Sequence, residues 1–240
     1  MEKKLISVSN LIKTGWQLCL KNYKQFILPI AVLLPAYLLL YLLDLFIFPG
    51  QEMISLLVMA LAIFINLWIS ILLIELINKI HKNQNININE LFQSSMKKIA
   101  SYFWVLILIS LIIMLGFILL IIPGIIFAIW YSFAEYIVVL EDIKGVKSLK
   151  DSKDLVRGRW GAAFWRLVLP SLLVYVFGGL IALVLTLIFS LGNIDFSALD
   201  QNLMFNAIVS LIFIILSPLF TAYGVILYNN LKDTKKVIIQ

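Results

Sequence analysis

Six apolar stretches dominate this sequence, and most of them are long enough to cross a lipid bilayer as a helix. A membrane-spanning helix needs about 20 apolar residues, because the hydrocarbon core is roughly 30 Å thick. The composition agrees, since 62% of the 240 residues are hydrophobic and only 13% are charged. We therefore predict an all-α, polytopic integral membrane protein with six transmembrane helices, at residues 26–48, 53–77, 102–122, 125–140, 167–191 and 205–228.

The fourth stretch is the shortest of the six. Its 16 residues give about 24 Å of helix, which is less than the thickness of the hydrocarbon core. Pro123 and Gly124 separate it from the third stretch and predict a tight turn. We expect this turn to lie below the outer membrane surface, where other helices shield its backbone from lipid.

Three polar segments between these stretches have the periodicity of amphipathic helices. The first covers residues 8–23, with Ser7 or Ser9 as N-cap; the second begins at Glu90 after an Asn89 cap. The third runs from residue 146 within the basic interval 141–166, and Gly158 is placed to end it. Each is predicted to lie at the cytoplasmic membrane surface with its apolar side toward lipid.

The three segments align on a hydroxyl residue, with apolar residues three positions before it and four after it. The aligned residues are Thr14, Ser95 and Ser152. The alignment predicts one membrane domain over 1–240, built from three units of an amphipathic helix and a two-helix hairpin, at 8–80, 87–140 and 144–231. The alternative is that any interfacial helix next to a span shows this spacing.

The distribution of charge predicts the orientation. If the six spans alternate, all 19 Lys and Arg residues fall on one side of the membrane. The opposite connections carry no Lys or Arg but contain four acids, Asp44, Glu52, Asp195 and Asp200. The positive-inside bias then places both termini in the cytoplasm of a multi-pass cell-membrane protein.

The basic interval 141–166 contains the predicted contact with lipid or a partner. Its candidate residues are Lys153, Arg157, Arg159 and Trp160, because Arg binds phosphate with a fork of donors and Trp prefers the interface. The expected partners are anionic headgroups at the cytoplasmic face, with a protein partner or a second copy of the chain as further candidates. The alternative is that these cations only mark the topology.

Three polar residues lie within the predicted spans: Asn66, Glu75 and Glu135. Glu75 is predicted to pair with Lys79, four residues later, and Glu135 with an arginine of the basic interval. Asn66 is typical of a contact between helices. The alternative is a proton or cation relay through these groups.

The sequence predicts no catalytic residue, cofactor or metal. Cys19 and His81 are the only residues of their kinds, which excludes an intrachain disulfide and argues against a Cys/His zinc site. No glycine-rich phosphate motif is present. The basic residues lie between apolar spans, so we expect attraction to headgroups and no nucleic-acid partner.

Residues 121–160 resemble the signature of the glycerophosphoryl diester phosphodiesterase membrane-domain family. That signature has a Pro-Gly turn, a span that ends in an acid, and a pattern of leucine, small residues and tryptophan. The matching residues are Pro123, Gly124, Glu141, Leu149, Ser152, Leu155, Gly158 and Trp160. The family's enzymes add a soluble barrel that has no counterpart here, so the resemblance implies a stand-alone membrane domain without that activity.

The expected function is a non-enzymatic membrane module that organises lipid or a partner protein at the cytoplasmic face. The alternative is a small transporter or channel, whose Pro- and Gly-broken helices would surround Asn66, Glu75 and Glu135. A polar path that joins these three residues would favour the transporter. A tightly packed apolar interior would favour the module.

Overall fold

A computed structural model describes residues 5–27, 29–31, 52–191 and 203–239. Every regular element in these ranges is an α-helix, and five helices are long and apolar enough to cross a membrane. These candidate spans are Leu56–His81, Ile88–Leu119, Ile121–Glu141, Trp160–Leu185 and Ile212–Lys235. The all-α membrane class is therefore confirmed, while most of the predicted first span lies outside the described residues.

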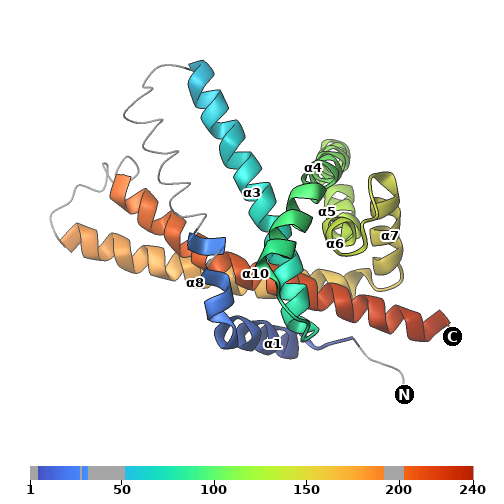
Figure 1. Cartoon of the computed structure of the whole chain (residues 1–240). Helices are drawn as coiled ribbons and strands as arrows, with labels where there is room; N and C mark the ends of the chain where they lie inside the picture. The colour runs from blue at the N-terminus through green and yellow to red at the C-terminus, as the bar shows by residue number, and fades with distance from the viewer. Residues whose placement is uncertain (1–4, 28, 32–51, 192–202, 240) are drawn as a thin grey trace.

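The described helices follow one another along the chain with short connections (Figure 1). They are α1 (Val8–Lys21), α3 (Glu52–His81), α4 (Ile88–Leu119), α5 (Ile121–Tyr131), α6 (Ala134–Glu141), α7 (Val146–Val156), α8 (Trp160–Leu191) and α10 (Leu203–Ile239). Helices α8 and α10 lie side by side, and α3 rises away from them. The short helices α6 and α7 lie near the C-terminal part of α10.

Side-chain caps fix where two of these helices begin. The Ser7 hydroxyl accepts a hydrogen bond from the N–H of Asn10 at 3.2 Å, as predicted for α1. In α4 the cap is Asn87, whose side chain accepts from the N–H groups of Asn89 and Glu90. The predicted Asn89 cap is therefore wrong by two residues, because the amide that satisfies the free N–H groups of the first turn comes from Asn87.

Helix α4 carries the second amphipathic segment and the third apolar stretch without a break. The sequence predicted a surface helix followed by a separate span. No proline or glycine occurs in α4 before Gly116, so nothing in the sequence interrupts the helical hydrogen bonds. The third apolar stretch therefore continues the amphipathic segment as one helix.

The chain reverses between α4 and α5 at Leu120, a single extended residue with φ −168° and ψ 157°. The predicted turn at Pro123 and Gly124 is wrong, since both residues lie in the first turn of α5. Proline is tolerated there because the first N–H groups of a helix have no helical partner. A Cβ on Gly124 would lie 2.6 Å from the Phe117 ring, so glycine permits the two helices to pack closely.

The predicted fourth span is two helices, α5 and α6, separated at Ser132 and Phe133. Ser152 of α7 binds at this break. Its hydroxyl donates to the carbonyl of Trp130 at 2.7 Å and accepts from the N–H of Phe133 at 3.1 Å. A fully buried hydroxyl therefore satisfies the backbone groups that the break releases.

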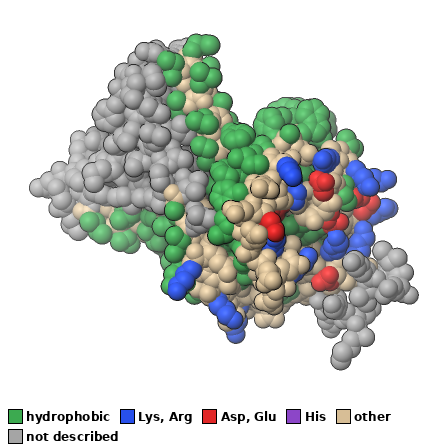
Figure 2. All heavy atoms as spheres, viewed as in Figure 1, with side chains coloured by type: hydrophobic (Ala, Val, Ile, Leu, Met, Phe, Trp, Pro, Cys, Tyr) green, Lys and Arg blue, Asp and Glu red, His purple; other side chains and the backbone are tan. Residues whose placement is uncertain are grey.

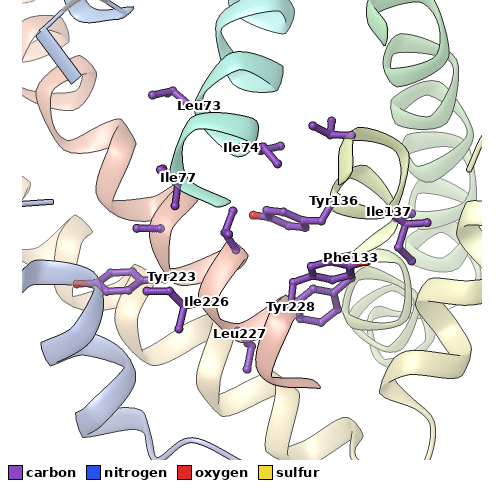
Figure 3. Close-up of a cluster of buried hydrophobic side chains, with 14 of the residues drawn as sticks. Leu73, Ile74, Ile77, Phe133, Tyr136, Ile137, Tyr223, Ile226, Leu227 and Tyr228 are labelled. Carbon is purple, nitrogen blue, oxygen red and sulfur yellow. The ribbon is translucent and has the colours of Figure 1, made fainter. Parts of the chain in front are cut away.

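The core forms where α3, α6 and α10 meet (Figure 3). Helix α10 is central: 56% of its most apolar stretch is buried, against 17% in α4 and in α8. The rings of Tyr136 and Tyr228 stack with centroids 6.0 Å apart. The other side chains labelled in this core are Leu73, Ile74, Ile77, Phe133, Ile137, Tyr223, Ile226 and Leu227.

Each amphipathic segment packs against another described helix. Helix α1 packs on α10, the N-terminal part of α4 on α3, and α7 on α5 and α6. In each case a small residue meets an aromatic residue: Gly15 meets Tyr223, Ser95 meets Trp68, and Ser152 meets Trp130. The first amphipathic segment, α1, thus packs on α10, which is the last described helix.

The apolar sides of these segments face protein, and the prediction that they face lipid is wrong. Leu11 in α1 and Val156 in α7 are fully buried. The buried small residue of α1 is Gly15, while Thr14 is only half-buried. The structural counterpart of Ser95 and Ser152 in α1 is therefore Gly15, one residue later than the Thr14 of the sequence alignment. The division of the chain into three units stays a prediction.

Gly224 of α10 tests the packing of this core. A Cβ there would lie 2.5 Å from Cζ of Tyr136, whose ring is held against Tyr228. We expect Gly224→Ala to lower the free energy of unfolding by about 1 to 3 kcal/mol through overpacking. Gly179 of α8 is the matched control, since a Cβ there meets nothing within 4 Å. Thermal unfolding in detergent should lower the midpoint of G224A alone, and equal midpoints would contradict this packing.

Candidate functional site

Most charged side chains visible in Figure 2 gather at the end of the molecule that carries α7 and the C-terminal part of α10. The described parts of α3 and α8 that extend away from this end are hydrophobic. We call this end the polar end. Any site that uses charge must be built there.

Glu75 of α3 is buried and forms an ion pair with α4. Nζ of Lys98 lies 2.5 Å from Oε1 of Glu75 and also donates to the carbonyl of Val139 at 2.6 Å. The lysine therefore joins α3, α4 and α6. The predicted pair with Lys79 is wrong, because Lys79 lies 3.8 Å from Glu90.

Helix α4 also provides the partner of the second intramembrane acid. Tyr102 donates to Oε2 of Glu135 at 2.8 Å, so the predicted arginine partner is wrong. Ser94 donates to Glu75 at 2.7 Å. Ser94, Lys98 and Tyr102 are spaced four residues apart and share one face of α4. This polar stripe was visible in the sequence and could have predicted where both acids are bound.

Asn66 lies in α3 about two and a half turns before Glu75. Its carbonyl accepts a hydrogen bond from the Ser70 hydroxyl at 2.8 Å. Glu75 and Glu135 are bound in two different side-chain pairs, so the pairing pattern gives no support to a relay through the three groups.

Two adjoining recesses lie at the polar end, with volumes of about 210 and about 230 Å³. They share Glu141, Tyr228 and Lys232. Nζ of Lys232 lies 2.6 Å from Oε1 of Glu141, and Tyr228 donates to the same oxygen. The remaining polar lining residues are Asp151, Asp154 and Lys235 in one recess and His81, Lys82, Asn229 and Asp233 in the other. Their charges largely balance, and neither recess is lined by the intramembrane acids.

Two arginines of the basic interval bind within the protein. Arg159 donates to Oγ1 of Thr234 at 2.6 Å and to the carbonyl of Leu231 at 3.1 Å, and partial burial lowers its pKa. Arg166 donates to the carbonyl of Ile6 at 2.6 Å. These guanidinium groups fasten α10 and the N-terminal segment to the start of α8. The sequence predicted Arg159 as a contact for a headgroup or partner, but its guanidinium group is already bound within the protein.

The other three predicted contact residues, Lys153, Trp160 and Arg157, differ in their surroundings. Nζ of Lys153 lies 4.3 Å from the Trp130 ring centre, a cation–π contact. Trp160 stacks on Phe164 with centroids 5.3 Å apart, and its Nε1 is buried without a hydrogen-bond partner in the described part of the chain. Arg157 alone of the four is exposed.

Arg157 shares the outer side of α7 with two lysines. We call Lys147, Lys150 and Arg157 the α7 basic face. All three are exposed, and none of their side chains makes a hydrogen bond or ion pair with any residue that the structure describes. The opposite side of α7 is fixed on α5 and α6, so these charges are held outward.

The single cysteine and histidine do not form a metal site with the residues described here, among which no group of three His, Cys, Asp or Glu is close enough to hold an ion. Burial raises the pKa of the Cys19 thiol to about 12. The thiol is therefore protonated at neutral pH, and a protonated thiol is a poor nucleophile.

The Glu75–Lys98 pair can be tested by removing one partner or both. Lys98→Met leaves a buried carboxylate without its cation and should cost about 3 to 5 kcal/mol of stability. Glu75→Leu combined with Lys98→Met should recover most of that loss, because an apolar pair replaces the ion pair. Lys97→Met, at the exposed neighbouring lysine, is the control and should change little. Unfolding midpoints in detergent measure all three, and a double variant weaker than K98M would contradict the pairing.

Comparisons with known proteins place this chain in a family. A family model of UPF0259, described as an uncharacterised protein family, matches residues 49–222. A UPF0259 membrane protein of Sodalis glossinidius (strain morsitans) is 26% identical over 148 residues. The matched part is 62% of this chain and 57% of that relative, so the chain covers less than two thirds of the relative's length. No solved structure matches the chain.

The resemblance to the glycerophosphoryl diester phosphodiesterase membrane-domain family is wrong, because the matching family model and the relative are both UPF0259. The residues that carried it have packing roles: Gly124 permits close packing of α4 and α5, and Ser152 binds the α5–α6 break. Small residues recur wherever membrane helices pack closely, so such a pattern does not distinguish families. The UPF0259 model covers well over half of the sequence, and the chain belongs to the UPF0259 family of membrane proteins.

Proposed function

We propose that this protein is a membrane module that binds anionic lipid headgroups at the cytoplasmic surface through the α7 basic face. The supporting observation is that Lys147, Lys150 and Arg157 are exposed and unpaired within the described chain. Leu149 and Ser152, on the other side of the helix, are buried against α5 and α6. Because α7 is fixed, the cations need little ordering when a headgroup binds.

Charge and topology support the same placement. If the six apolar stretches pair into three hairpins, the open ends of these hairpins and all 19 Lys and Arg residues share one side. The cytoplasmic leaflet carries the anionic lipids, and each Lys or Arg near such a surface contributes about 1 kcal/mol. The α7 basic face would then meet the leaflet whose charge it complements.

The packing of the core favours a module over a transporter. The ends of α3, α6 and α10 meet through apolar and aromatic side chains. Glu75 and Glu135 are held by Lys98 and Tyr102 of α4. An acid that served a relay would need an exchangeable partner, and these partners are fixed by tertiary packing. The proposed module has no catalytic step.

Removal of the three charges tests the proposal. We expect Lys147→Gln, Lys150→Gln and Arg157→Gln together to weaken retention of anionic phospholipid by about two orders of magnitude, since three charges contribute about 3 kcal/mol. Native mass spectrometry of the protein released from mixed anionic and zwitterionic lipid measures the retained lipid. The control changes Lys13, Lys21 and Lys24, which are also exposed, to Gln and alters the net charge equally. Equal loss in both triple variants, or no loss in the α7 variant, would contradict a site on α7.

The orientation has its own test. A reporter enzyme that is active only in the cytoplasm, fused after Gln240, should be active, because the positive-inside bias places the C-terminal lysines there. The same reporter inserted after Gln51, in a connection that carries acids and no cations, should be inactive. The reverse pattern would overturn the cytoplasmic placement of the α7 basic face.

A further inference from the structure

The α4–α5 hairpin has a different tip from the other two hairpins. From Leu111 to Ile129 the sequence contains no polar or charged side chain. Residues Ile118–Ile122 around the reversal are 68 to 70% exposed, among the most exposed large hydrophobic side chains of the protein. The other two hairpins have connections that contain acids at 52, 195 and 200. None of the described helices covers this tip as expected, and a tip without polar groups is suited to hydrocarbon.

The lengths of the hairpins can be compared from equivalent starting points. These are Trp68, Trp130 and Tyr223, the aromatic residues that a small residue of an amphipathic segment contacts. We measure the length of helix between that aromatic residue and the helix end near the reversal. It is about 24 Å for Glu52–Trp68 of α3 and about 30 Å for Leu203–Tyr223 of α10. The corresponding part of α5, Ile121–Trp130, is only about 14 Å long. By this measure, the α5 arm of the middle hairpin is about half as long as the matching arms of the others.

The base of α5 lies beside α7, which the proposed function places at the headgroups. Nζ of Lys153 lies 4.3 Å from the Trp130 ring centre, so a cation of α7 sits beside this part of α5. The α7 basic face points outward from the same short helix. An ammonium group and a tryptophan ring at this position are typical of the membrane interface. A hairpin that rises about 14 Å from there ends near the middle of a core that is about 30 Å thick.

The reversal satisfies part of its own backbone, and each paired group lowers the cost of entering hydrocarbon. The N–H of Leu120 donates to the carbonyl of Gly116 at 3.0 Å, and the carbonyl of Leu120 accepts from the N–H of Gly124 at 3.4 Å. Pro123 has no N–H to satisfy. The N–H groups of residues 121 and 122 and the carbonyls of residues 117–119 have no partner among the described residues.

We propose that the α4–α5 hairpin is a re-entrant element that enters from the cytoplasmic side and ends near the bilayer midplane. Its interaction surface is Ile118–Ile122, and its partner is the acyl chains of the cytoplasmic leaflet. The third and fourth stretches, which the sequence counted as spans, then do not cross the membrane. This inference rests on the proposed placement of α7 at the headgroups, and it concerns the depth of the hairpin and not the charge of α7.

Spin-label depth measurements on the full chain in liposomes test this inference. Labels are attached at Leu111, Met114 and Leu120 in turn, in a Cys19→Ser background; all three positions are exposed. The ratio of collisions with oxygen to collisions with a water-soluble nickel chelate should rise steadily from Leu111 to Leu120. At Leu120 the collisions with the chelate should fall to background. Met53, 75% exposed at the far end of α3, is the control and should collide freely with the chelate.

Two outcomes would overturn the inference. A ratio that peaks near Leu111 and falls at Leu120 to the value at Met53 would show that the hairpin crosses the bilayer. A label at Leu120 that neither oxygen nor the chelate reaches would show that protein, and not lipid, covers the tip. In both cases the native mass spectrometry of the triple variants would still test headgroup binding by α7, so the two proposals can fail separately.

Discussion

The fold depends on a close contact between a small residue and an aromatic residue, made three times. Gly15, Ser95 and Ser152 each lack a bulky side chain, so the helix that carries them can approach an aromatic residue of a neighbouring hairpin. Helix α1 is thereby joined to α10, α4 to α3, and α7 to α5. These contacts help to hold α3, α6 and α10 together in one core. The distal parts of the hairpins remain apolar and exposed, as a bilayer requires.

This arrangement divides the cations into two groups with different roles. Lys98, Arg159 and Arg166 bind acids, hydroxyls or carbonyls that packing has placed beside them. Their desolvation is offset by those bonds, and they hold helices together. Lys147 and Lys150 lie on the outer side of a helix whose inner side is already occupied. Only cations of this second group are available to a headgroup, so the count of basic residues overstates the size of a lipid site.

Hydrophobic patterning was enough to predict the membrane class and much of the first and third amphipathic helices, including the end of α7 before Gly158. It could not predict what covers an apolar face, because lipid and protein interiors are equally apolar. The partner of Glu75 was also beyond a local rule, since tertiary packing brings Lys98 closer than the lysine four residues away. Pro123 is compatible with a turn or with a first helical turn, and only the packing of Gly124 on Phe117 decides between them.

The central claim is that the apolar side of α7 packs on protein and does not rest on the membrane. Leu149, which is 5% exposed, reports on this directly if it is replaced by a photoreactive aliphatic amino acid in liposomes that contain anionic lipid. Irradiation followed by mass spectrometry should find cross-links from position 149 to helices of the same chain. Phospholipid adducts as the main product at that position would contradict the account.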